Sequence, residues 1–280
     1  MKVLPFKIPK PDYDALVYQE DYDLMFYDKL HQHEEIQLSY IVEGEGTLIV
    51  GDTINDYKSG DLLIIGSNLP HVFKSDTNAS SSSHMLSLFF SRTSFGEFFF
   101  ELEELAELRL FFKRATHGFK ITTSKKAISK LFLDLKSASK FELFLQLLNI
   151  MKIASTSTYK SLSSFIYEKK YNDNEGKRMR GVFEYTMSNF EKDISLEIIA
   201  EVANMTKNAF CKYFKKRTNK TYVQFLNELR IENACKLILT KDDLSISEIA
   251  YISGFKNISN FNRQFKSLKL VSPSAYRKRQ

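Results

Sequence analysis

The sequence predicts a two-domain α+β protein. An N-terminal β-barrel with a helical appendage precedes an all-α domain in which two helix-turn-helix units are joined by a long helix. Three observations support this prediction. Residues 15–90 alternate short apolar and aromatic runs with Gly, Asp, Asn and Ser turns, which is typical of strands. Apolar residues of the region 94–155 recur at helical spacing. The last third of the chain contains one helical pattern twice.

The strand region has the turn signals of an antiparallel β structure. The clearest predicted strands are 36–42, 47–50 and 61–65, with turns at 43–46, 55–56 and 67–68. Many short strands without an intervening helix indicate a sandwich or a small barrel. A small barrel has an interior wide enough for one small ligand.

The next region is predicted to be helical and then to become polar. Apolar residues at helical spacing predict helices at 95–108, 124–137 and 141–153. Their apolar stripes need a partner, and covering the barrel or forming a dimer interface are equal alternatives. A polar, breaker-rich stretch then predicts a linker. The expected organisation is a barrel at 1–92, a helical segment at 93–168, a linker at 169–176 and a second, helical domain at 177–280.

The repeated pattern in the last third is a short helix, a tight turn and a second helix. The copies span 195–215 and 245–266, with Asn204 and Gly254 at the turns. Asn and Gly tolerate the left-handed backbone that such a turn needs. Each second helix has an aromatic pair four residues apart, which forms one buried stripe: Phe210 with Phe214, and Phe261 with Phe265. The unit is a helix-turn-helix, whose second helix can enter a DNA major groove.

Residues 178–279 resemble the DNA-binding domain of the AraC/XylS transcription regulators. The resemblance includes the duplicated unit, a connecting helix at 222–239 and the closing motif Val-Ser-Pro-Ser-Ala-Tyr-Arg at 271–277. It implies an activator that binds promoter or operator DNA as a homodimer and contacts RNA polymerase. The family usually has Gly where this chain has Asn219 and Leu270. Leu at positive φ is strained, so the turn after Lys269 is expected to differ.

The buried aromatic pairs define which side chains of the second helices face outward. The positions opposite them match the family's DNA-contacting residues and are Asn208, Cys211, Lys212 and Lys215 on the first helix, and Ser259, Asn262, Arg263 and Lys266 on the second. Arg263 is the strongest candidate for base recognition, because a guanidinium can bind guanine bidentately. The lysines are expected on phosphates. A solvated helix face is the alternative for each of the others.

Charge and composition agree with a DNA-binding second domain. From Glu175 onward there are 20 Lys and Arg against 11 Asp and Glu, a net charge of +9, and the whole chain has +6, which leaves −3 for residues 1–174. A basic excess beside the repeat suits phosphate binding. The two cysteines lack metal-site spacing, and no secretory signal or long apolar run is present. A cytoplasmic protein without membrane contact is therefore expected.

Histidines in the strand region suggest a pocket. His31 and His33 are two residues apart and would face the same way on a strand. Together with Gly44, Gly60 and His71 they resemble the two cupin motifs, which implies a cupin-like barrel and a small-molecule effector. The expected pocket residues are His31, His33, Gln37, Tyr40 and His71. Structural histidines are the alternative.

No metal and no other cofactor are expected, because Gln37 stands where a metal-binding cupin has Glu. A neutral amide removes the charge that helps to hold a dication. Two rival functions remain: a metal-dependent cupin enzyme fused to a DNA-binding domain, and an architectural DNA-binding protein without an effector. No catalytic residues are assigned, since the sequence shows no acid–base pair.

Overall fold

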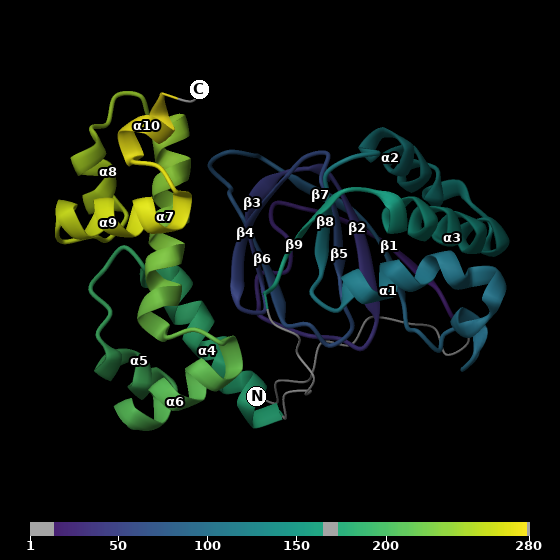
Figure 1. Ribbon diagram of the computed structural model, residues 1–280, viewed down its shortest axis with the longest axis horizontal. Helices are drawn as coiled ribbons and strands as arrows, with labels where there is room; N and C mark the ends of the chain where they lie inside the picture. Colours follow the sequence, from purple (N-terminus) through teal and green to yellow (C-terminus); the bar gives the residue numbers. More distant parts are fainter. Residues whose placement is uncertain (1–13, 165–172, 279–280) are drawn as a thin grey trace. The chain divides into compact units, whose positions relative to one another are not determined.

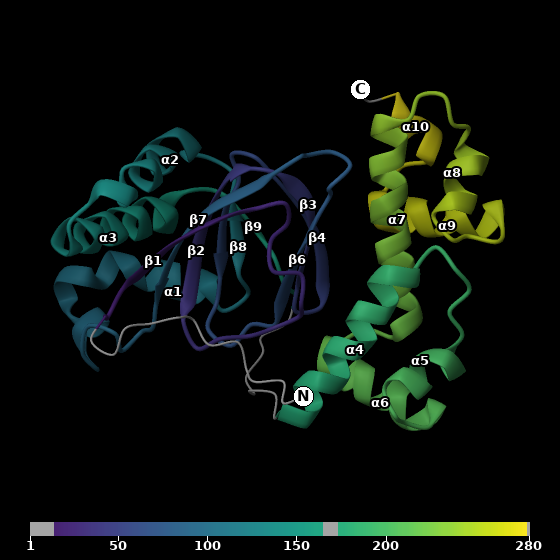
Figure 2. The ribbon, with the colours of Figure 1, turned by 180° about the vertical axis from the view of Figure 1, so that it is seen from behind.

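The computed structural model describes residues 14–164 and 173–278, and the chain divides into two compact units, Met1–Gly176 and Lys177–Gln280. The first contains two β-sheets with helices along one side, and the second is built of helices (Figures 1 and 2). The predicted α+β class and the two-part organisation of a cupin region and a helix-turn-helix domain are confirmed.

The strands of the first unit form two antiparallel sheets. A six-stranded sheet has the order β1-β7-β2-β5-β8-β9, and a three-stranded sheet has the order β4-β3-β6. The strands are β1 (Val17–Asp23), β2 (Ile36–Glu43), β3 (Glu45–Val50), β4 (Thr53–Lys58), β5 (Leu62–Ile65), β6 (His71–Ser75), β7 (Ser83–Phe90), β8 (Phe119–Ile121) and β9 (Tyr159–Ser161).

Both faces of the larger sheet are covered, and β5 shows why. All four of its residues are buried, although side chains alternate between the two faces of a strand. Leu62 and Ile64 pack in the cluster that includes the helices, whereas Leu63 and Ile65 pack in the cluster between the two sheets. A continuous apolar run therefore occurs because one side meets the barrel interior and the other meets the helical appendage.

The appendage contains η1 (Phe99–Glu101), η2 (Glu103–Leu108), α1 (Arg109–Ala115), α2 (Lys125–Leu133), η3 (Leu135–Ser137) and α3 (Lys140–Thr156). The segment at 93–168 was predicted to be helical, and its described part, 93–164, also contains two short strands, β8 and β9, which extend the six-stranded sheet. Three-residue strands are too short to show a periodic pattern. The predicted turn at 55–56 was also wrong, because these residues lie in β4 and the turn comes at Gly51 and Asp52.

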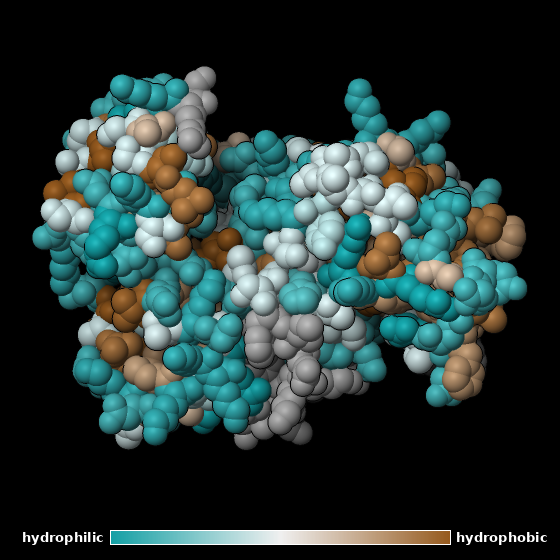
Figure 3. Space-filling model, in the orientation of Figure 1, coloured by the Kyte–Doolittle hydropathy of each residue, from teal (hydrophilic) through white to brown (hydrophobic). Residues whose placement is uncertain are grey.

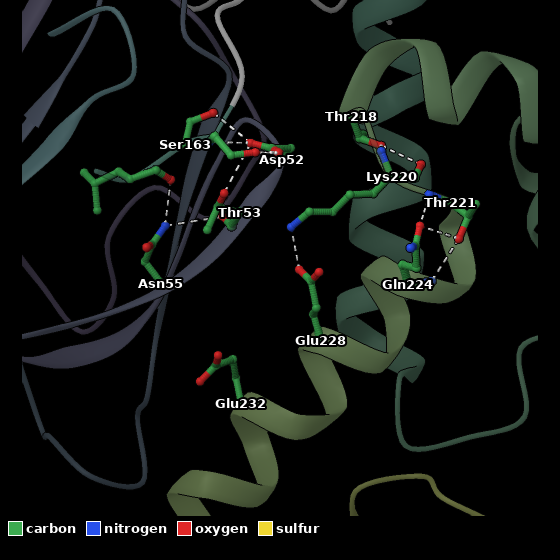
Figure 4. A network of polar contacts seen from close by, with 12 residues as sticks. Asp52, Thr53, Asn55, Ser163, Thr218, Lys220, Thr221, Gln224, Glu228 and Glu232 are labelled. Atoms are coloured by element: carbon green, nitrogen blue, oxygen red, sulfur yellow. Dashed lines mark hydrogen bonds and ion pairs between the residues drawn. The ribbon is translucent and has the colours of Figure 1, made fainter. Parts of the chain in front are cut away.

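Hydrogen bonds hold residues 162–164, which follow β9, against the barrel (Figure 4). The buried carboxylate of Asp52 accepts hydrogen bonds from the Ser163 hydroxyl at 2.8 Å and from the Ser164 backbone N–H at 3.0 Å. Asn55 donates to the carbonyl oxygen of Leu162 at 2.9 Å. The last described residues before the C-terminal unit are therefore held by side chains more than 100 residues earlier.

The second unit comprises α4 (Asp173–Asn189), α5 (Leu196–Val202), α6 (Lys207–Thr218), α7 (Tyr222–Thr240), α8 (Ile246–Ile252), α9 (Ile258–Lys269) and α10 (Pro273–Arg277). The capping box predicted at Ser245 and Glu248 begins α8, and a second one at Thr221 and Gln224 begins α7 (Figure 4). Of the predicted linker at 169–176, residues 169–172 lie outside the described residues and the remainder is already helical.

The two turns of the repeat adopt the expected backbone. Asn204 has φ 51° and Gly254 has φ 88°, both left-handed. The expectation that the turn after Lys269 would depart from the left-handed form was wrong. Leu270 has φ 62° and its N–H donates to the Lys266 carbonyl at 3.0 Å. Its side chain is 83% exposed, so nothing but backbone strain opposes Leu at this helix end.

Candidate functional site

The second helix of each repeat presents one exposed polar face. Phe210 and Phe214 of α6 are fully buried, as are Phe261 and Phe265 of α9. On the opposite faces seven of the eight predicted contact residues are exposed and Cys211 is half-buried. The structure thus brings the two predicted sets onto two continuous helix surfaces: Asn208, Cys211, Lys212 and Lys215 on α6, and Ser259, Asn262, Arg263 and Lys266 on α9.

Arg263 is held in place by a residue that the sequence analysis missed. Its Nη2 donates to the Asn260 side-chain oxygen at 2.8 Å, one helical turn earlier. Asn260 in turn lies in the first turn of α9, where its N–H donates to the Asn257 cap. The sequence shows Asn257, Asn260 and Arg263 at a spacing of three residues. That they form a chain of hydrogen bonds can be inferred only once Asn257 is known to be the N-cap of α9.

Several cations on the recognition faces have no carboxylate partner among the residues that the structure describes: Lys212, Lys215, Arg263 and Lys266. Neighbouring lysines are paired instead. Lys207 contacts Glu197 at 2.7 Å and Lys256 contacts Asp193 at 2.6 Å. Because phosphate binding needs positive charge that is not already neutralised, the unpaired set is the one suited to DNA.

The turn of the second repeat packs against Arg230 of α7 and against the segment that follows α4. Arg230 of α7 donates from Nε to the Phe190 carbonyl and from Nη2 to the Lys192 carbonyl, each at 2.7 Å. Burial lowers the pKa of Arg230. Position 254 has no room for a side chain, because a Cβ there would lie 2.6 Å from the Phe190 oxygen and 2.8 Å from Arg230 Nε. Glycine avoids both clashes.

The first unit contains a pocket of about 260 Å³ inside the barrel. It has an apolar wall and a polar wall, and the side chains that line it are Gln19, Asp21, Phe26, Tyr27, His31, Gln37, His71, Phe73, Met85 and Phe89. Burial raises the pKa of Asp21, which accepts a hydrogen bond from Gln19 at 2.7 Å. The sequence analysis missed the residues from β1 and β7, because their strand register was not assigned.

The three predicted histidines lie close together, and two of them, His31 and His71, line this pocket. His31 and His71 form an isolated backbone bridge, with ring centroids 4.2 Å apart, and the centroids of His33 and His71 are 5.0 Å apart. One ligand atom from each ring lies within 4.8 Å of the others. The sequence analysis expected His31 and His33 to face the same way on one strand. That expectation was wrong, because both residues lie in a loop before β2. The bridge to β6 and the loop bring the rings together.

Hydrogen bonds define the same tautomer in all three rings. Each Nδ1 lies beside a backbone carbonyl: His31 beside Lys29 at 2.7 Å, His33 beside Glu35 at 2.8 Å, and His71 beside Leu69 at 2.8 Å. A carbonyl only accepts, so Nδ1 carries the proton and Nε2 carries the lone pair. Burial lowers the pKa of His33, and burial with the neighbouring imidazoles lowers that of His71 further. Both rings are therefore neutral.

Gln37 and Tyr40 have different places from each other. Gln37 lines the pocket, and its Oε1 lies 3.2 Å from His33 Nε2. Tyr40 is on the opposite face of β2, where it packs with Phe132 of α2 at 6.1 Å between ring centroids. The prediction that Tyr40 lines the pocket was wrong, because Tyr40 is three positions after Gln37, an odd spacing, and side chains alternate along a strand.

The cupin fold implies a metal in some of its members, and these residues fit one. His71 is 0% exposed, and its Nε2 has no hydrogen-bond partner among the described residues, which is costly for a buried polar atom. Three imidazole nitrogens and an amide oxygen suit zinc, iron, copper or nickel. His31, His33, His71 and Gln37 would hold the ion, which would supply a positive charge and open coordination positions in the pocket.

Comparison with known proteins gives two domain matches. Residues 199–279 match the helix-turn-helix domain and residues 27–87 match the cupin domain. The uncharacterised HTH-type regulator YdeC of Bacillus subtilis is 23% identical over 261 residues, 90% of this chain and 87% of that protein. A Staphylococcus aureus HTH-type regulator is 31% identical over 144 residues, and the match spans 18% of its length. Among solved structures, the C-terminal domain of the response regulator AraT from Geobacillus stearothermophilus shows 29% identity over 37% of this chain and 85% of that one, with a TM-score of 0.35.

The fold, the exposed recognition helices, the two domain matches and the sequence relatives indicate a DNA-binding transcription regulator of the helix-turn-helix class. The chain combines a cupin domain at 27–87 with a helix-turn-helix domain at 199–279, which agrees with the resemblance to AraC-type regulators found in the sequence. The relatives named above are transcription regulators. Among the described helices, none has the length and apolar character needed to cross a membrane.

Proposed function

We propose that this regulator is an effector-responsive transcription activator that binds operator DNA as a homodimer and contacts RNA polymerase. The observation that supports it most is the pair of exposed recognition faces on α6 and α9, joined by the single helix α7. Two such helices on one rigid connector suit successive major grooves, about 34 Å apart. Because its target is the chromosome, we place the protein in the cytoplasm.

The proposed DNA contacts divide into two kinds. Arg263 is the base-reading residue, supported by its exposed guanidinium and by the Asn260 contact that orients it. Asn208 and Asn262 are positioned for adenine edges. Lys212, Lys215 and Lys266 provide phosphate contacts, which set the position of the protein on DNA without specifying sequence.

The proposed dimer uses the appendage. Figure 3 shows apolar side chains on the surface over α1–α3. Phe141 is 69% exposed and Leu145 is 42% exposed, four residues apart on α3, and Leu133 of α2 is 56% exposed. Apolar side chains in such a stripe favour a helical partner. We therefore propose that 93–168 is a dimerisation region and that its helices also cover the barrel.

The test is a binding titration with Arg263→Ala. Genomic DNA fragments enriched by the purified protein would first supply an operator, and fluorescence anisotropy would then measure affinity for it and for single-base variants. Loss of a bidentate contact costs about 1–3 kcal/mol and relaxes specificity at one base. The matched control is Lys241→Ala, an exposed cation outside both recognition faces. Unchanged discrimination between bases in the Arg263 variant would refute the assignment.

Salt dependence separates the regulator from an architectural DNA-binding protein. Specific binding retains a large preference for the operator as salt rises, whereas purely electrostatic binding is lost on all sequences alike. Enrichment of fragments without a shared motif would favour the architectural function. A two-block motif with about one helical turn between the blocks would support a sequence-specific regulator.

A further inference from the structure

The described side chains that line the barrel pocket provide metal ligands but no lysine or arginine. His31, His33 and His71 would each coordinate an ion through a neutral ring nitrogen, and Gln37 would coordinate it through a neutral amide oxygen. Asp21 is the carboxylic acid among the described lining residues. A divalent ion held by four neutral ligands would keep its full charge and would attract an anion.

We propose that the pocket is a receptor for a small carboxylate ligand, bound through a divalent transition-metal ion that His31, His33, His71 and Gln37 hold. The inference deepens the proposed function, because it names the chemical class of the effector. Only one part of the inference depends on the proposed function, namely that binding of the ligand regulates transcription. Binding of the ion and of the carboxylate is a property of the barrel and can be tested without DNA.

Two observations at buried atoms support the ion. The Nε2 of His71 lies in a fully buried ring, borders the pocket and has no partner among the described residues. Gln37 Oε1 faces the lone pair of His33 Nε2 at 3.2 Å. In the neutral ring, two lone pairs at this distance repel unless a cation lies between them or the amide rotates by 180°, whereas a protonated ring would donate a hydrogen bond to Oε1. Ligand atoms within 4.8 Å need only small side-chain movements to reach the roughly 3.4 Å spacing around a tetrahedral ion.

The orientation of Gln37 is connected to a buried hydroxyl pair. Its Nε2 donates to Ser39 Oγ at 2.9 Å, and Ser39 Oγ lies 2.8 Å from Ser87 Oγ. Both serines are buried on neighbouring strands, β2 and β7. Outer contacts of this kind orient a metal ligand. They make Ser39 a positioning residue for the amide oxygen.

The rest of the pocket fits the organic part of a short carboxylate. Phe26, Phe73, Met85 and Phe89 are the apolar part of the lining, and Phe73 and Phe89 pack edge-on against His71 and His33. A volume of about 260 Å³ is slightly below the usual range of ligand pockets. The ligand is therefore a small molecule with a carboxylate at one end and a short apolar body.

The experiment uses the full chain with Co²⁺, whose visible absorption reports its ligands, and butyrate as the probe. We expect one Co²⁺ per chain and a change in the spectrum when butyrate is added, with no butyrate binding in calorimetry after chelation of the metal. Gln37→Glu supplies the missing negative charge. It should bind Co²⁺ at least about tenfold more tightly and butyrate at least about tenfold more weakly than the wild type.

These opposite changes cannot arise from partial unfolding, which would weaken both. The matched control is His84→Ala, which removes a histidine outside the pocket that contacts Glu20, and it should leave both affinities unchanged. Absence of stoichiometric Co²⁺, butyrate binding without metal, or equal butyrate affinity in Gln37→Glu would each overturn the proposal. Operator binding measured on the same preparations tests the proposed function separately: its loss with an intact Co²⁺ site counts against the regulator and not against the receptor.

Discussion

Gly254→Ala should destabilise the second helix-turn-helix far more than the addition of one methyl group would suggest. Gly254 has φ 88°, where a Cβ costs about 1–2 kcal/mol. The added carbon would lie 2.6 Å from the Phe190 carbonyl oxygen and 2.8 Å from Arg230 Nε, two atoms that hydrogen-bond to each other at 2.7 Å. Breaking a charged hydrogen bond costs about 1.5–3 kcal/mol. Reduced freedom of the unfolded chain returns about 0.4–1 kcal/mol, so the net loss is about 2–4 kcal/mol.

Thermal unfolding followed by helical circular dichroism measures this loss. For a unit of this size, 1 kcal/mol shifts the midpoint by about 4–8 °C, so the transition of the C-terminal unit should fall by roughly 10 °C or more. Asn204→Ala is the matched control, because it changes the equivalent turn of the first repeat at φ 51° from one residue with a Cβ to another. A Gly254→Ala variant as stable as Asn204→Ala would refute the packing argument.

Three further variants test separate parts of the structure. Leu270→Gly should stabilise the C-terminal unit by about 0.5–1 kcal/mol in thermal unfolding, because it relieves left-handed strain at an exposed side chain; a loss of stability would contradict this. Asp52→Ala should destabilise the barrel by about 2 kcal/mol in urea titration, since donors from Ser163 and Ser164 lose a buried carboxylate; an unchanged midpoint would show that the contact contributes nothing. Lys266→Ala should reduce the slope of log affinity against log salt by about 1 without changing base preference, and altered preference would make Lys266 a base contact.

The DNA-binding half is well predicted from the sequence because its determining contacts are local. An aromatic pair at i and i+4 specifies the buried face, and the opposite face follows from helix geometry alone. Caps such as Ser245 with Glu248 define where a helix begins. Asn204 and Gly254 indicate the turns. All of these relationships connect residues within a few positions, so one sequence contains them completely.

The barrel was predicted less well, because its arrangement depends on strand register and on contacts distant in the chain. Tyr40 was assigned to the wrong face, and β8 and β9 were missed, since three-residue strands have no readable period. The same limit applies to one contact of the C-terminal unit, because the hydrogen bond from Arg230 to the Phe190 carbonyl joins residues 40 positions apart and was not predicted. The proximity of His31 to His71 likewise depends on a bridge across 40 residues.

The sequence by itself therefore determined the class of the protein, the duplicated DNA-binding unit and the outward faces of its recognition helices. Only the tertiary structure decided which nitrogen of each histidine carries the lone pair, that Gln37 faces His33, and which strands enclose the pocket. The physical reason is the separation along the chain of the residues whose contacts determine each feature. Helix periodicity and capping are set by neighbours along the chain, whereas a pocket is assembled by pairings whose register no single segment specifies.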